Sequence, residues 1–234
     1  MNWFRSLLST RAPGVALPAA YAQRLAALRG LPPHDSRTPL RTQRWMVVDV
    51  ETGGLDAEKD ALLSIGAIII EGGRIQLGCA FESHLQQTSA TSHENILIHG
   101  LTHSRQLSGT LALDALLDFA EFAGSTPLVA FHAAFDRTAL QTAMKQKTGW
   151  QLANHWLDAA VIAPLLFPDM AKRCRHLDDW LTAFKLENFG RHSALADAVA
   201  TAQLWQILLE AATRQQIATT HQLQNLLLAR KWLG

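Results

Sequence analysis

The sequence predicts an α/β domain with a mixed β-sheet. Three strand-like segments come first in the chain, and a mixture of strand-like and helix-like segments follows them. The first strands are apolar and β-branched, and a glycine-containing turn joins the second to the third, as in an antiparallel meander. Later segments carry apolar residues on one helical stripe, with one further short strand among them.

Each strand is predicted from an apolar run that is bounded by turn-prone residues. The first strand ends in a loop at Gly53 and Gly54, and residues 71–74 form the turn between the second and third strands. The predicted strands are residues 45–50, 62–70, 75–82 and 127–131.

The helices are predicted from apolar residues at helical spacing and from residues that start or stop a helix. Gly124 ends one helix, Pro168 closes another, and Ser193 is the N-cap residue of the longest one. The predicted helices are residues 19–28, 111–123, 136–147, 156–167, 177–184, 193–210 and a last segment that reaches about residue 233.

The composition limits the class of protein. Of 234 residues, 48% are hydrophobic and 18% are charged, so we expect a sizeable core and exclude disorder and a disulfide scaffold. Two cysteines, Cys79 and Cys174, fit a reducing cytosol. No apolar stretch approaches the roughly 18 residues that a membrane-spanning helix needs. We therefore expect a cytoplasmic protein without a membrane partner.

Charge is divided unevenly along the chain. The net charge is +1, but residues 1–44 contain seven arginines and one aspartate, which leaves −5 for the remainder. We expect residues 1–44 to be a basic extension with one short helix and a linker, residues 45–211 to be the main domain, and residues 212–234 to be a last helix packed on or extending it. Two interpretations of the extension stay open: a loosely ordered, solvated leader, which the looseness of termini favours, or an arm that contacts phosphates.

Two acidic residues stand where the first strand opens into its loop. Asp49 and Glu51 are two positions apart, so their side chains point to the same side of the sheet. Two neighbouring carboxylates in an apolar strand are costly unless a positive group neutralises them. A strand that simply reaches solvent is the alternative interpretation.

Two further acidic residues stand at the starts of helices. Asp136 follows the fourth strand, and Asp197 lies in the first turn of the helix that Ser193 caps. Capping and the helix dipole alone would explain an acid at either position. His192 is five residues before Asp197, so the two side chains share a target only if His192 precedes the helix.

The four carboxylates and the histidine together favour one chemistry. Mg²⁺ prefers carboxylate oxygens and keeps water and substrate phosphate in its shell. Two such ions stabilise the attacking and leaving oxygens of phosphodiester hydrolysis. A histidine that titrates near neutrality can take the proton of the attacking water.

This ordered set of motifs resembles the DEDDh 3′-5′ exonucleases, over about residues 45–209. Asp49 with Glu51 looks like the first motif, Asp136 after Ala133-Ala134-Phe135 like the second, and His192 with Asp197 like the third. The resemblance implies a ribonuclease H-like mixed five-stranded sheet flanked by helices, with residues 45–211 as the exonuclease domain. It also implies two Mg²⁺ or Mn²⁺ ions held by the four acids, and His192 as the general base.

The resemblance further implies contacts with the terminal nucleotide. It places Glu94 and His99, in the segment of residues 94–102, against that nucleotide, and it places Thr52 beside the terminal sugar. The remaining predicted substrate contacts are Gly53, His132 and Phe135, although core packing is the favoured interpretation of Phe135. The spacing of His99 and His103 could suggest zinc, but Gly100 weakens a helix there and the glutamate of a zinc-protease motif is missing.

Two positions depart from the family pattern. Gly53 stands where many members carry a second threonine, which loosens the loop. His132 stands where many carry asparagine, which brings a titratable group to the site.

We therefore expect a metal-dependent 3′-5′ exonuclease that releases nucleoside monophosphates from the 3′ ends of single-stranded DNA and acts in DNA repair. A 3′-5′ exoribonuclease similar to RNase T or oligoribonuclease is the first alternative, because Gly53-Gly54 and Asp60-Ala61-Leu62-Leu63 look like RNase T. A nucleic-acid-binding module without turnover is the second. The chain ends 37 residues after Asp197, so we expect no stable association with a polymerase.

Overall fold

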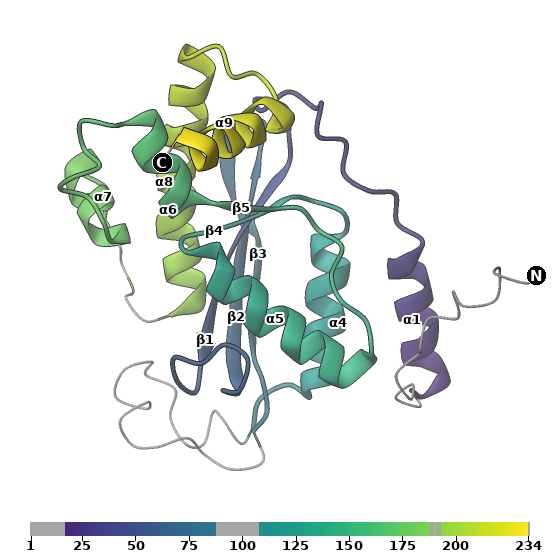
Figure 1. The fold of residues 1–234 in the computed structure, drawn as a ribbon. Helices are drawn as coiled ribbons and strands as arrows, with labels where there is room; N and C mark the ends of the chain where they lie inside the picture. Colours follow the sequence, from purple (N-terminus) through teal and green to yellow (C-terminus); the bar gives the residue numbers. More distant parts are fainter. Residues whose placement is uncertain (1–16, 88–107, 188–189, 191–192, 234) are drawn as a thin grey trace, which may run out of the picture.

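The protein is built around a five-stranded sheet flanked by helices (Figure 1). The computed structural model describes residues 17–87, 108–187, 190 and 193–233. The strands are β1 (Trp45–Thr52), β2 (Leu62–Glu71), β3 (Arg74–His84), β4 (Leu128–Ala130) and β5 (Trp156–Asp158). Their spatial order is β3-β2-β1-β4-β5. β2 pairs antiparallel with both β1 and β3, whereas β4 pairs parallel with both β1 and β5. The predicted fold class is confirmed.

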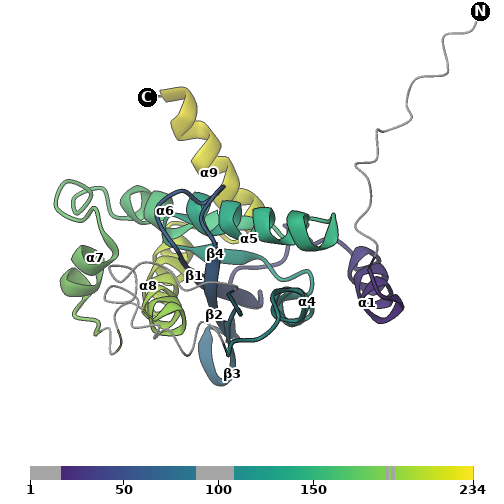
Figure 2. The same ribbon diagram turned by 90° about the horizontal axis from the view of Figure 1, so that it is seen from below.

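Helices cover both faces of the sheet. The helices are α1 (Ala19–Arg29), α4 (Ala112–Ala123), α5 (Ala133–Thr148), α6 (Ala159–Leu166), α7 (Leu177–Phe184), α8 (Ala194–Arg214) and α9 (Thr220–Leu233). Figure 2 shows α4 and α8 on opposite sides of the strands. The side chains of β1 alternate between these two sides, because successive residues of a strand point to opposite faces.

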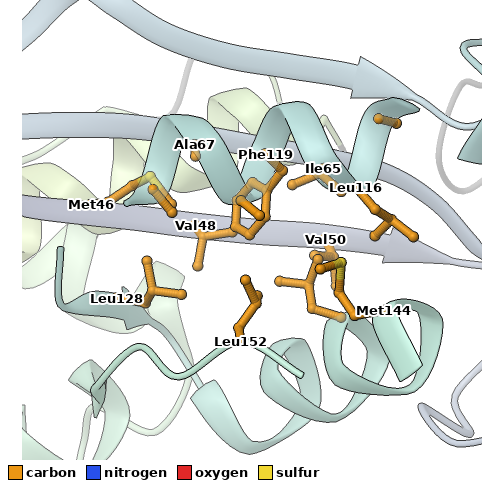
Figure 3. Packing of buried hydrophobic residues seen from close by; sticks show 14 of the residues in the cluster. Met46, Val48, Val50, Ile65, Ala67, Leu116, Phe119, Leu128, Met144 and Leu152 are labelled. Carbon is orange, nitrogen blue, oxygen red and sulfur yellow. The ribbon is translucent and has the colours of Figure 1, made fainter. Parts of the chain in front are cut away.

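The first core cluster lies between the sheet and helices α1, α4 and α5. It contains the even-numbered β1 residues Met46, Val48 and Val50, together with Phe119 of α4 and Met144 of α5 (Figure 3). All five side chains are at most 6% exposed. The side chains that the middle of β1 directs to this face are therefore all apolar.

The second core cluster lies between the sheet and helices α6, α7, α8 and α9. From β1 it takes the odd-numbered residues Trp45 and Val47. Trp45 packs edge-on against Trp205 of α8, with ring centroids 5.3 Å apart. The next odd-numbered residues are Asp49 and Glu51, so the apolar α8 face of β1 becomes acidic towards the end of the strand.

The parallel strands place their carboxyl ends at one edge of the sheet. β1 and β4 run in the same direction with Met46 opposite Leu128, and β4 and β5 with Ala130 opposite Asp158. Helices α5 and α6 begin directly after β4 and β5. The loops that carry the predicted second motif and the end of β1 consequently meet at this edge.

Two expectations are corrected by the structure. Residues 156–158, predicted as the start of a helix, form β5, since a three-residue strand is too short to show a period of two. A loosely ordered leader is wrong for residues 17–44, because Leu25 and Leu28 are buried in the first cluster and Leu40 in the second. Residues 1–16 lie outside the described part of the chain.

Polar contacts also hold residues 17–44 on the domain. The guanidinium of Arg24 contacts Asp118 at 2.5 Å and Glu121 at 2.7 Å, both on α4. The Leu40 N–H donates to the carbonyl oxygen of Ala218 at 2.8 Å. The positive charge of Arg24 is therefore offset by acids of the domain itself.

This packing predicts that α1 unfolds together with the rest of the domain. Leu25 is 3% exposed, so Leu25→Ala should lower the unfolding free energy of the protein by about 2–5 kcal/mol, because apolar burial is lost and a cavity remains. The matched control Leu31→Ala, at 42% exposure, should lose much less. Denaturant unfolding of both variants measures this, and each should still unfold in a single cooperative transition. Equally small losses of unfolding free energy in the two variants would show that α1 does not stabilise the domain.

Candidate active site

Three carboxylates from two elements form one group at the acidic end of β1. Asp49 and Glu51 come from β1, and Asp197 comes from the first turn of α8. Each offers an oxygen, and these oxygens all lie within 4.8 Å of one another. Glu51 is 8% exposed, and the other two are half-buried. Such a group of hard oxygen donors fits a divalent cation.

Asp136 approaches the same place from α5. Its carboxylate Oδ1 accepts the Val50 N–H at 3.1 Å, between the two acidic positions of β1, and the residue is 4% exposed. Among the residues that the structure describes, the group with oxygens within 4.8 Å of one another consists of Asp49, Glu51 and Asp197, and Asp136 lies outside it. It adds a fourth negative charge beside that group.

Burial and mutual repulsion raise the pKa values of Asp49, Glu51 and Asp136. Burial, then the charge of Asp197, raises the pKa of Glu51 to about 7. Burial raises the pKa of Asp136 to about 8, against the lowering effect of its own N–H and that of Val50. The pKa of Asp49 lies well above its usual range, first because of burial and then because of its acidic neighbours. A bound divalent cation would offset both causes, so the donor set fits a metal ion.

The loop before α5 is held by an acid that the sequence analysis missed. His132 adopts the left-handed conformation with φ 64°, and its N–H donates to Oδ1 of Asp158 at 3.0 Å. The same oxygen accepts the Ala160 N–H at 2.9 Å and so caps α6. An aspartate directly before an apolar helix is the usual sign of an N-cap residue. It was missed because residues 156–158 were assigned to the helix itself.

The structure places most of the predicted substrate contacts near this edge. Thr52 is 4% exposed and donates its hydroxyl to the Gly54 carbonyl at 2.6 Å, while the Gly53 N–H donates to Ala61 at 2.8 Å. His132 is exposed. Phe135 is half-buried and packs against the first core cluster.

Three predicted site residues lie outside the described residues: His192, Glu94 and His99. Ser193, the residue after His192, occupies the N-cap position of α8, as the sequence predicts. Its side chain makes no capping hydrogen bond, however. Asp197 still falls in the first turn of α8.

Clustered acids at the carboxyl end of the first strand of a mixed sheet are an arrangement that fits a divalent cation and, with it, phosphodiester hydrolysis. The exonuclease family model matches residues 46–205, and the chain belongs to this family. The resemblance stated from the three motifs is thereby confirmed. In the described part of the chain, no helix is both long enough and apolar enough to cross a membrane.

The curated relatives are much longer proteins. The chain is 30% identical over 186 residues to a PolC-type DNA polymerase III of Oceanobacillus iheyensis, a match covering 77% of this chain and 12% of the relative. The corresponding protein of Bacillus subtilis is 29% identical over 179 residues, covering 76% of this chain and 12% of the relative. The chain thus spans about an eighth of the length of these polymerases.

Solved structures share the fold. Exonuclease X in complex with 5′-overhanging duplex DNA aligns with a TM-score of 0.62 at 20% identity, covering 78% of this chain and 99% of that one. Exonuclease I of E. coli in complex with a dA16 oligonucleotide aligns with a TM-score of 0.63 at 15% identity, covering 74% of this chain and 42% of that one. A further exonuclease I structure is a zinc-bound form with single-stranded DNA.

The raised acid pKa values predict that the metal-free protein loses stability as pH rises. An acid whose folded-state pKa is raised stabilises the fold below its unfolded pKa of about 4 and loses that contribution as pH rises through the folded value. For Glu51 and Asp136 the loss continues to pH 7 and 8. With chelator, the Tm should fall by on the order of 5 °C between pH 6.5 and 8.5, and excess Mn²⁺ should remove most of that fall.

Two partly buried histidines add nothing to this change. Burial lowers the pKa of both His34 and His155, so these histidines stay neutral above pH 6.5. Glu51→Gln removes one repelling acid and should flatten the metal-free profile, whereas Glu58→Gln, at an exposed loop position, should not. A metal-free Tm that is constant over this range would contradict the repulsion argument.

Proposed function

We propose that this chain is a 3′-5′ exonuclease that removes nucleoside monophosphates from single-stranded DNA ends, with residues 45–211 as the exonuclease domain. The group of Asp49, Glu51 and Asp197 within 4.8 Å carries the proposal, because clustered carboxylates repel one another and a divalent cation bound between them offsets that repulsion. Membership of the exonuclease family supports the reaction class.

The proposed cofactor is a pair of Mg²⁺ or Mn²⁺ ions, which when bound would activate water and stabilise the charge that develops on the phosphodiester. Asp49, Glu51 and Asp197 would hold them, and Asp136 would complete the set of acids. Glu51, with its pKa raised to about 7, must lose its proton to act as a ligand. His192, beside Ser193 at the start of α8, would take the proton of the attacking water.

The terminal nucleotide would lie at the loops around the acids. Thr52 and Gly53 form the end of β1 and its loop, and Thr52 is fixed there by its hydrogen bond to Gly54. His132 stands exposed at the start of α5, with its backbone held by Asp158. We propose these residues, with Phe135, Glu94 and His99, as the contacts to the terminal nucleotide.

DNA is the favoured substrate because the similar proteins act on DNA or are solved with DNA bound. The curated relatives are DNA polymerases, and the exonuclease I and exonuclease X structures contain DNA. RNA is the second candidate, favoured by Gly53-Gly54 and by the segment at residues 60–63, which resemble RNase T. A binding module without turnover would have no use for four clustered acids.

The test is a gel assay with 5′-labelled single-stranded DNA and RNA of matched sequence, run with Mg²⁺, Mn²⁺ or chelator. Wild type should give a metal-dependent ladder that shortens from the 3′ end and is stronger on DNA. Asp49→Ala should lose at least about 100-fold in rate, because a metal ligand and its charge are removed. Glu58→Gln, an exposed acid in the neighbouring loop, should cleave as wild type does.

Each outcome of the assay decides something. A stronger ladder on RNA would move the proposal to the ribonuclease alternative. Tight binding of the oligonucleotides without any cleavage would replace it with the binding module. A metal-independent ladder that persists in Asp49→Ala would exclude the carboxylate group as the active site.

The role of His192 has a separate test. His192→Ala should lower turnover by about 10²–10⁴-fold, the usual contribution of a general base, while Mn²⁺ affinity stays near that of wild type. The control is His221→Ala, at an exposed position of α9, which should change neither quantity. Full activity in His192→Ala would assign proton transfer to another group.

A further inference from the structure

Gly66 lies on β2 directly beside Asp49, where α8 begins to cross the sheet. The antiparallel register pairs Asp49 with Gly66, and paired residues face the same side of a sheet. That side is the α8 side, since Ile68 and Ile70, the next residues of β2 with this orientation, belong to the second core cluster. Gly66 is therefore the neighbour of the metal-binding group on the strand next to β1.

There is no room for a side chain at this position. A Cβ on Gly66 would lie 2.1 Å from the Leu195 nitrogen, and 2.2 Å and 2.5 Å from the carbonyl carbon and oxygen of Ala194. These atoms are main-chain atoms of the first turn of α8, so no side-chain rotation can relieve the overlap. Reaching an ordinary contact of about 3.4 Å would displace that turn by more than about 1 Å.

The close approach is local to the site end of α8. On the outer strand, Gly78 of β3 has nothing within 4 Å of its Cβ position. Along α8, the fully buried Ala198 and Ala202 follow Ala194 at one-turn intervals, and the large Trp205 packs on Trp45 beyond them. Small residues thus bring the amino-terminal end of α8 onto the sheet, and large ones fill the space at the other end.

The same first turn carries Asp197. Its N–H donates to the Ser193 carbonyl oxygen at 2.9 Å, so the residue moves with the turn. Mg²⁺ requires its oxygen ligands at about 2.0–2.1 Å, so a displacement of roughly 1 Å would break the contact. We propose that Gly66 is a positioning residue of the metal centre: the missing side chain lets α8 approach β1 closely enough for Asp197 to join Asp49 and Glu51. This inference rests on the proposed function, because it takes these acids as metal ligands.

The test measures Mn²⁺ affinity by titration calorimetry rather than nuclease activity. Gly66→Ala should bind Mn²⁺ at least tenfold more weakly than wild type, and the control Gly78→Ala should stay within twofold. Asp197→Glu alone should weaken binding. In the Gly66→Ala background the same change should strengthen binding, because a carboxylate one methylene longer can reach across the widened gap. A merely structural role for Gly66 would give no such reversal.

Two results would overturn the proposal. One is Mn²⁺ affinity within twofold of wild type in a folded Gly66→Ala protein. The other is weakened binding that Asp197→Glu does not improve, which would indicate general damage. If the wild type itself binds no Mn²⁺ in an Asp49-dependent way, the proposed metal site fails, and that result is distinct from either.

A second pair of variants decides the matter if Gly66→Ala does not fold. Ala198→Val and Ala202→Val enlarge equally buried positions one turn apart, both within the second core cluster. Ala198→Val, next to Asp197, should lower Mn²⁺ affinity about tenfold, whereas Ala202→Val should stay within about threefold. Equal losses in the two variants would overturn the inference.

Discussion

Four carboxylates meet at one edge of the sheet, and the cost of keeping them there shapes the surrounding structure. Burial makes each charge expensive and strengthens the repulsion between them. The acids come from three elements, so no single segment can carry them apart without breaking its own packing. They are Asp49 and Glu51 of β1, Asp136 of α5 and Asp197 of α8. The rest of the fold has to hold these elements together against that repulsion.

The two core clusters supply this opposing force. On one side of β1, the residues Met46, Val48 and Val50 pack against α4 and α5. On the other side, Trp45 and the helix residue Trp205 fill the far end of the sheet–helix contact. Large apolar side chains therefore anchor α8 and α5 away from the acids. The acidic ends of these elements are thereby held at a fixed separation by packing that lies away from the acids.

Sequence patterns predicted much of this arrangement and missed the parts set by tertiary contacts. The alternation along β1 was enough to place Asp49 and Glu51 on one side, because a strand has a fixed period of two. The start of α8 was predicted through Ser193, although its hydroxyl makes no capping bond. β5 was missed because its three residues show no periodicity and gain their structure from pairing with β4. Asp158 was lost with it.

The close contact at Gly66 could not be predicted from a single sequence either. A glycine within an apolar strand fits a bulge, a bend or a close approach equally well, and only the position of α8 decides among them. The packing of residues 17–44 could not be predicted for the same reason. Leu25 and Leu28 would fit any short helix with apolar residues at helical spacing, and only the position of α4 shows that they are buried. Local patterns identify the chemistry of a residue, whereas its neighbours depend on segments far away in the chain.

Repulsion among the acids links stability to metal binding. A cation that binds only the folded protein stabilises it by an amount set by its affinity. Part of that affinity is the relief of repulsion between ligands that the fold has already brought together, so the free energy lost in the metal-free state is recovered on binding. Replacing an acid such as Glu51 by its amide would thus stabilise the empty site while weakening the bound one. The charges that oppose folding are the same charges that attract the ion. A fold that keeps these acids together is therefore less stable without the ion and binds it more tightly.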